Sequence, residues 1–296
     1  VAIGYDALST EDAHGNNVAI GYQALENQDA GTNAYNVAIG YDAGTLVSTG
    51  PYNTLIGGLA GDALTTGGHN VAVGQGALST EDTGGKNLYA LDAGADAYNV
   101  AVGYQAGYTM TTGTDNTLMG GFAGDALTTG TYNVAIGRSA LSTEDAYGYN
   151  VAIGTWALLN QDAGDNAYNT AVGYAAGENI TTGLRNTLIG GLAGDAITTG
   201  AYNTAVGMQA LSAEDAHGRN TAIGYGALQV QDAGADAYNV AVGFQAGVAV
   251  STAIRATLIG GGAGIALTTG GQNTAIGTDA LKVVTTGSNN TAVGCF

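Results

Sequence analysis

The sequence predicts an all-β fold, a parallel β-roll or β-solenoid, and three observations support this prediction. The phrase Asn-Val/Thr-Ala/Leu-Ile/Val-Gly recurs along the chain, mostly every 17 residues and sometimes every 19, and a short fixed period is the signature of a repeat architecture. No stretch shows the sustained i, i+3, i+4 pattern of a helix. The 51 glycines and single proline among 296 residues suit a chain that turns at regular intervals. We expect about 17 short coils.

Each coil is expected to begin with a short strand formed by the three residues after the Asn, such as Val37, Ala38 and Ile39. Side chains alternate along a strand, so the first and third residues share one face and the middle residue lies on the other. The third position is Ile, Val or Met in every complete copy, and we expect it to point into the core. The Gly that follows ends the strand and permits a tight corner.

After that Gly, two variable residues lead to Ala-Leu or Ala-Gly, as in residues 22–25 and 41–44. We expect a second short strand here, followed by a polar turn that returns the chain to the next Asn. Two short strands per coil favour a flattened roll.

A longer period of 70 residues groups the coils in fours, with steps of 17, 19, 17 and 17 residues. The resulting four-coil units are approximately 1–69, 70–132, 133–202 and 203–272, with a partial unit at 273–296. The second unit is seven residues short, and the loss falls between Asn87 and Asn99, where we expect a shorter coil. Each coil packs only on its neighbours, so residues 1–296 are predicted to form a single elongated domain. Both ends fall inside a repeat phrase, which indicates a segment of a longer chain.

The Asn that opens the phrase, here called the anchor, is replaced only by Ala256. Stacked coils place equivalent residues about 4.8 Å apart, so the anchor side chains can hydrogen-bond from coil to coil as a ladder. A preference of Asn for the local turn is an equally good and compatible explanation. The predicted structural ladder comprises Asn17, Asn36, Asn53, Asn70, Asn87, Asn99, Asn116, Asn133, Asn150, Asn169, Asn186, Asn203, Asn220, Asn239, Asn273 and Asn290.

The middle strand position is Ala in most coils and becomes bulky only once in each four-coil unit. A face of small side chains allows another backbone layer to approach closely. We therefore expect copies of the chain to pack around a common axis, with one leucine layer per unit, formed by Leu55, Leu118, Leu188 and Leu258.

Charge and composition exclude several classes of partner. The formal net charge is -18 and the chain has only six Lys and Arg residues, whereas nucleic-acid binding requires clustered cations that neutralise phosphates. No apolar run approaches the roughly 18 residues needed to cross a bilayer, so we expect no membrane insertion by this segment. Cys295 is the single cysteine and cannot form an internal disulfide.

Two groups of carboxylates are candidates for binding cations. Asp62, Asp125 and Asp195 follow Gly-rich phrases that partly match a calcium-binding nonapeptide, but the fourth unit has Ile265 at this position. A solvated turn Asp is the simpler interpretation, and these three are only weak metal candidates. The pairs Glu11-Asp12, Glu81-Asp82, Glu144-Asp145 and Glu214-Asp215, with Asp29, Asp92, Asp162 and Asp232 in the next coils, recur in every complete unit. We expect solubilising loops here, since single carboxylates four coils apart cannot share an ion.

The sequence carries no pattern of catalytic residues. His14 and His217 are equivalent, but Gly84 and Tyr147 take their place in the other units, so no His, Ser and carboxylate constellation persists and no cofactor is expected. The 17 tyrosines are either structural or form exposed rows that stack on sugar rings. Trp156 and residues 248–255 are the most unusual positions at which such binding could occur.

The repeated phrase resembles the head repeats of YadA-type trimeric autotransporter adhesins. It also resembles the arrays of bacteriophage tail-fibre proteins, as in Asn-Thr-Ala-Ile-Gly-Tyr-Gly-Ala-Leu at residues 220–228. This resemblance covers the whole chain and implies a left-handed parallel β-roll, a homotrimer, and an extracellular place on a virion or bacterial surface. The long coils suit the tail-fibre interpretation better. Two functions remain: a rigid fibre shaft that carries a receptor-binding tip, or an adhesin whose own surface binds host glycan or matrix.

Overall fold

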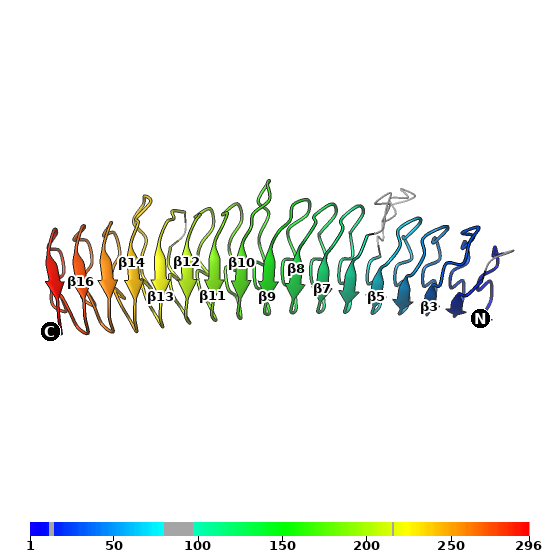
Figure 1. Cartoon of the computed structure of the whole chain (residues 1–296), viewed down its shortest axis with the longest axis horizontal. Helices are drawn as coiled ribbons and strands as arrows, with labels where there is room; N and C mark the ends of the chain where they lie inside the picture. The colour runs from blue at the N-terminus through cyan, green and yellow to red at the C-terminus, as the bar shows by residue number, and fades with distance from the viewer. Residues whose placement is uncertain (12–14, 80–96, 215, 296) are drawn as a thin grey trace. The chain divides into compact units, whose positions relative to one another are not determined.

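The computed structural model describes residues 1–11, 15–79, 97–214 and 216–295. These residues form two compact bodies, Val1–Tyr149 and Asn150–Phe296, here called the N-terminal and C-terminal bodies. Both are parallel β-solenoids without helices in their described parts, and each described coil contributes one short strand (Figure 1). The predicted all-β solenoid class is therefore confirmed. The described residues include no helix of the length and apolar character that crossing a bilayer requires.

The strands of each body follow one another at the repeat spacing. Those of the N-terminal body are β1 (Ala2–Ile3), β2 (Val18–Ile20), β3 (Val37–Ile39), β4 (Thr54–Ile56), β5 (Val71–Val73), β6 (Val100–Val102), β7 (Thr117–Met119) and β8 (Val134–Ile136). Those of the C-terminal body are β9 (Val151–Ile153), β10 (Thr170–Val172), β11 (Thr187–Ile189), β12 (Thr204–Val206), β13 (Thr221–Ile223), β14 (Val240–Val242), β15 (Thr257–Ile259), β16 (Thr274–Ile276) and β17 (Thr291–Val293).

Within each body, consecutive strands pair in parallel and in register. In the pairing of β3 with β4, for example, Ala38 lies opposite Leu55 and Ile39 opposite Ile56. Equivalent positions of successive coils are therefore stacked directly on one another. The prediction of a separate short coil between Asn87 and Asn99 was wrong in one respect, because β5 pairs directly with β6, with Val71 opposite Val100. The segment that joins these two strands lies largely outside the described residues.

The assignment of the two strand faces from the sequence was wrong. The middle residues, such as Ala38 and Ala205, are fully buried, whereas third-position residues such as Ile56 and Ile189 are 38% and 39% exposed. The middle residue therefore faces the core. The interior of a coil is narrow, so the small side chain fits inside and the large one lies on the outer face.

The segment after the strand forms a turn and not the predicted second strand. Gln23 and Leu25 have φ angles of 51° and 50°, in the left-handed region that extended strands do not use. Alternate residues of this segment are left-handed in other coils as well, as at Ser139 and Leu141, with φ 52° at both. This tight turn limits the width of the coil.

The predicted packing role of Leu55, Leu118, Leu188 and Leu258 was also wrong, because all four are fully buried inside their own chain. Each fills space left by two glycines. A Cβ atom at Gly44 would lie 2.6 Å from Leu55 Cδ1, and one at Gly61 would lie 2.7 Å from Leu55 Cδ2. Both glycines are eighth after their anchor, where other coils have a buried Leu such as Leu25. The four leucines therefore belong to the core of their own chain. Each fills the volume that glycines in two adjacent coils leave open, which is here called the exchange of volume between Leu and Gly.

Candidate functional site

The predicted asparagine ladder is present in the described residues. Asn36 Oδ1 accepts a hydrogen bond from the backbone amide of Asn53 at 2.7 Å. Its Nδ2 donates to the carbonyl of Gly50 at 2.7 Å. Each rung therefore joins an anchor side chain to the backbone of the next anchor, and the anchors from Asn36 to Asn273 that the structure describes are buried. The prediction of Asn87 as a rung was wrong: the ladder passes directly from Asn70 to Asn99, whose backbone amide donates to Asn70 Oδ1 at 3.3 Å. Asn87 itself lies outside the described residues.

Ala256, which replaces an anchor Asn, keeps only the backbone hydrogen bond of the ladder. Its backbone amide donates to Asn239 Oδ1 at 2.8 Å, but its methyl group offers no acceptor to the following coil. This coil therefore retains the connection to its predecessor while losing the side-chain connection to its successor.

Sequence reasoning missed a second buried polar position, eleven residues after the anchor. Gln161 Oε1 accepts from Asn169 Nδ2 at 2.6 Å, and Gln231 Oε1 accepts from Asn239 Nδ2 at 2.6 Å. In the C-terminal body this position runs through Gln161, Ile180, Ile197, Glu214, Gln231, Val250 and Leu267, all fully buried. The cycle of one Glu, one Gln and two apolar residues is a core feature of the four-coil unit, and counting from each anchor would have found it.

The three weak metal candidates do not converge on a site. Asp62 and Asp125 belong to different coils of the N-terminal body, and Asp195 belongs to the C-terminal body. None of them belongs to a group of three potential ligands in the described part of the chain. Burial raises the pKa of Asp125 to about 6, and burial is also the main cause of the raised pKa of Asp195. These aspartates are partly desolvated turn residues.

The glutamates of the acidic pairs do not all lie in solvent, as the solubilising interpretation requires. Glu144 and Glu214 are fully buried, whereas Asp145, the partner of Glu144 in the sequence, is exposed. Glu144 Oε1 accepts from the backbone amide of Tyr147 at 3.1 Å. Glu214 Oε1 accepts from the backbone amide of His217 in the same way, so these two buried glutamates each organise their own turn. Asp12, Glu81, Asp82, Asp92 and Asp215 lie outside the described residues.

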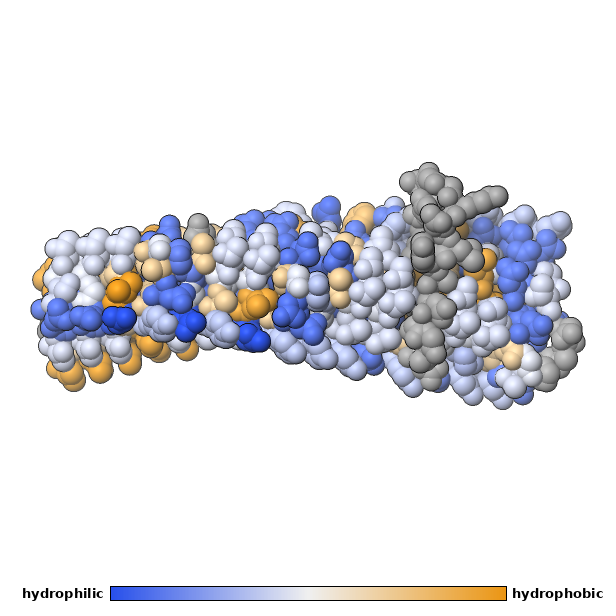
Figure 2. Space-filling view, turned by 90° about the horizontal axis from the view of Figure 1, so that it is seen from above, coloured by the Kyte–Doolittle hydropathy of each residue, from blue (hydrophilic) through white to orange (hydrophobic). Residues whose placement is uncertain are grey.

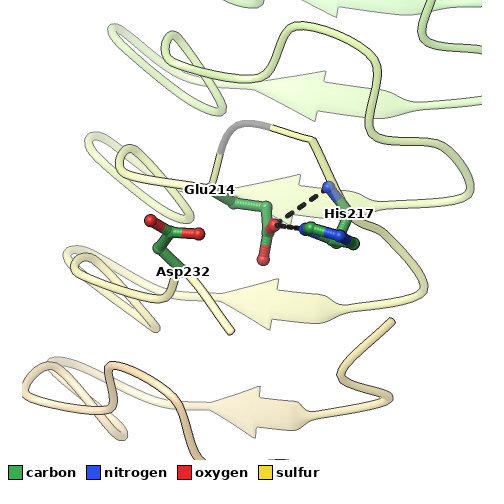
Figure 3. Close-up of side chains that lie close together, drawn as sticks. All are labelled: Glu214, His217 and Asp232. Carbon is green, nitrogen blue, oxygen red and sulfur yellow. Dashed lines mark hydrogen bonds and ion pairs between the residues drawn. The ribbon is translucent and has the colours of Figure 1, made fainter. Parts of the chain in front are cut away.

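The corner around Glu214 gathers three different titratable side chains (Figure 3). Glu214 Oε1 accepts from the backbone amide of His217 at 3.2 Å, and Glu214 Oε2 accepts from Asn220 Nδ2 at 3.2 Å. His217 Nδ1 lies 4.0 Å from Glu214 Oε1. The exposed Asp232 follows in the next coil, and one potential ligand atom from each of the three residues lies within 4.8 Å of the others.

The residues directly before the anchors form an outer column in each body. In the N-terminal body, Tyr35 stacks on Tyr52 with ring centroids 5.5 Å apart, and Tyr52 stacks on His69 at 4.9 Å. In the C-terminal body, the guanidinium groups of Arg185 and Arg219 each lie 5.5 Å from the ring of Tyr202. The ring faces are thus occupied by neighbouring column members, which leaves mainly ring edges for a ligand.

The third strand positions form an exposed apolar line along each body, here called the strand-face row. Ile3 and Val293, in the first and last strands, are 58% and 74% exposed. In the strands between them, the most exposed members are Ile39, Ile56, Met119, Ile189, Ile223, Ile259 and Ile276, at 36% to 41%. Figure 2 shows apolar residues gathered along one edge of the C-terminal body. A row of exposed apolar side chains is typical of an interaction face.

Comparison with known proteins gives no relative: no family model, curated protein or solved structure matches this chain.

Proposed function

We propose that this chain is a segment of a non-enzymatic, homotrimeric fibre shaft, in the first place of a phage tail fibre that holds a receptor-binding tip away from the particle. The observation that carries this proposal is the uniformity of the buried contacts. The ladder and the in-register pairing repeat from coil to coil, and the exchange of volume between Leu and Gly repeats once in each four-coil unit. The outer column, in contrast, changes freely between Tyr, His, Arg and Gln.

Such a distribution suits a mechanical role. In a binding or catalytic protein, the distinctive residues gather at one place, whereas here the repeated residues are inside and serve the coil itself. The net charge of -18 supports solubility of a long extracellular object, and the resemblance of residues 220–228 to tail-fibre arrays agrees with this assignment.

The strand-face row supports the homotrimer. Ile56 and Ile189 remain more than a third exposed in the single chain, and covering such a row with equivalent rows would remove it from water. We therefore propose that the contact between chains involves the strand face that carries the third-position residues. This is the face opposite to the one that the leucines predicted. Light scattering of the purified chain is expected to give three times the mass of one chain, and the double variant I56E/I189E is expected to weaken assembly. A monomeric wild-type protein would contradict the proposal.

The alternative is a trimeric bacterial adhesin whose roll binds host glycan or matrix directly. The exposed ring edges and guanidinium groups of the outer column favour it, because Tyr202 is 50% exposed and lies between two arginines. A glycan array probed with the trimer separates the two functions. If the trimer binds no glycan specifically, the result agrees with the shaft function. If it binds a glycan and Y202A abolishes that binding, the adhesin function would replace the shaft function.

A further inference from the structure

We infer that Glu214, His217 and Asp232 form a binding site for a divalent transition metal such as Zn²⁺, which joins two successive coils of the C-terminal body. Glu214 and His217 belong to the coil that begins with β12, and Asp232 belongs to the coil that begins with β13. Neither the mechanical function nor the ladder requires this site, so it is an additional property of the chain.

The donor set suits zinc. Zn²⁺ binds imidazole nitrogen and carboxylate oxygen, commonly with three protein ligands and a water at the fourth position. Ca²⁺ and Mg²⁺ prefer oxygen ligands, so an imidazole among three donors argues for a transition metal. The site contains one buried carboxylate, one imidazole and one exposed carboxylate (Figure 3).

The geometry requires only modest movement. Bonds of about 2.0–2.1 Å to a tetrahedral ion place ligand atoms about 3.4 Å apart, and the atoms now lie within 4.8 Å of one another. Glu214 is held by hydrogen bonds from His217 N and Asn220 Nδ2, so it supplies a fixed ligand. The side chain of His217 is 32% exposed and Asp232 is exposed, so both can rotate towards the ion.

Two observations besides the grouping point to a cation. His217 Nδ1 is buried and has no hydrogen-bond partner, although a buried ring nitrogen normally has one. The fully buried Glu214 also lies close to a second carboxylate, an arrangement that is unfavourable unless positive charge lies nearby.

The histidine distinguishes this corner from its relative in the N-terminal body. There, Tyr147 takes the position of His217, and its amide donates to Glu144 in the same way. The fold therefore accepts either residue, and only the histidine adds a metal ligand. Glu11, His14 and Asp29 repeat the spacing of Glu214, His217 and Asp232 in the sequence, although His14 lies outside the described residues.

The test is calorimetric titration of the metal-free 296-residue chain with Zn²⁺, comparing wild type with H217Y. Because Tyr147 occupies the equivalent place, H217Y is expected to fold normally, as circular dichroism would verify. The matched control is H69Y, the same chemical change in the outer column, where Tyr132 and Tyr202 are the equivalent residues. D232N is a second variant, at an exposed position that should not affect folding.

We expect wild type and H69Y to bind Zn²⁺ equally. H217Y and D232N should each weaken one equivalent of Zn²⁺ at least about tenfold, since even loss of an outer-shell partner costs 10–100-fold. The readout is the loss of binding on substitution, because any Zn²⁺ bound elsewhere in the chain is common to all four proteins. Unchanged Zn²⁺ binding in H217Y, absence of binding in wild type, or Ca²⁺ binding of equal strength in wild type and H217Y would overturn the assignment.

Discussion

The inner and outer stacks of each coil have the same spacing but differ in how much they vary. The inner stack contains the anchors and middle strand residues, which are nearly always Asn and Ala or Leu. In the part of the chain that the structure describes, the outer column contains Tyr, His, Arg, Asp, Gln and Asn, all in left-handed backbone conformation, as at Tyr202 with φ 61°. The inner positions are constrained by volume and hydrogen bonding, whereas the outer positions need only project into solvent. Burial, and not repetition alone, therefore determines which positions specify the fold.

The largest effect is expected from L188A, which empties the core beside Gly177 and Gly194. Leu188 is fully buried, and Leu→Ala changes in cores cost about 3–5 kcal/mol of unfolding free energy. Denaturant unfolding followed by circular dichroism measures the change.

A double-mutant cycle with G177L sharpens this prediction. A side chain at Gly177 would meet Leu188 Cδ1, since a Cβ there lies 2.7 Å from it. The single variant G177L is expected to lose about 1–3 kcal/mol through overpacking. L188A/G177L should lose clearly less than the sum of the two, because it restores the arrangement of coils with Leu at the eighth position. Additive losses would show that the two positions do not share one space.

The next effect is expected from breaking the ladder with N186A. Asn186 Oδ1 accepts from Asn203 N at 2.9 Å and Asn186 Nδ2 donates to the carbonyl of Gly200 at 2.9 Å. Leaving buried groups without partners costs about 1–3 kcal/mol. The exposed N179A, which also loses a hydrogen bond to a carbonyl, at 2.8 Å, is the matched control and should cost about 0.5 kcal/mol or less. Equal effects would remove the distinction between inner and outer positions.

A smaller, pH-dependent effect is expected from D125N. Burial raises the pKa of Asp125 to about 6 in the folded chain, against about 3.9 when unfolded. The contribution of Asp125 to the free energy of unfolding is therefore fully present below pH of about 4, and it is lost as the pH rises through about 6. D125N should stabilise the protein at neutral pH, by about 1 kcal/mol once solvent screening of this half-buried group is allowed for, and have little effect at pH of about 4. Thermal melts across this range test the sign, and a pH-independent effect would contradict it.

The smallest effect is expected from Y202A in the outer column. Tyr202 lies between Arg185 and Arg219, but it is half exposed, and exposed cation–π contacts contribute about 0.5–1 kcal/mol. The unfolding free energy of Y202A should therefore fall by less than about 1 kcal/mol. A loss as large as that of L188A would mean that the outer column specifies the fold as well.

The sequence by itself determined the repeat, the all-β class, the strand after each anchor and the ladder. These follow from local chemistry that recurs at one period: β-branched residues favour strands, and an amide side chain stacked on its copies can hydrogen-bond to them. Alternation along a strand, however, separates two faces without stating which is inside. The β-branched residues at the first and third positions therefore suggested the wrong core.

Only the tertiary structure decided how the narrow interior is filled. The left-handed turn at Gln23 and Leu25 restricts each coil, so Ala38 enters the core and Ile39 remains outside. Leu55 enters only where Gly44 and Gly61 make room. The grouping of Glu214, His217 and Asp232 likewise depends on two coils being stacked, because residues 15 to 18 positions apart in the sequence meet only when the coil closes. Volume and proximity are properties of neighbouring coils together, and no single repeat phrase contains them.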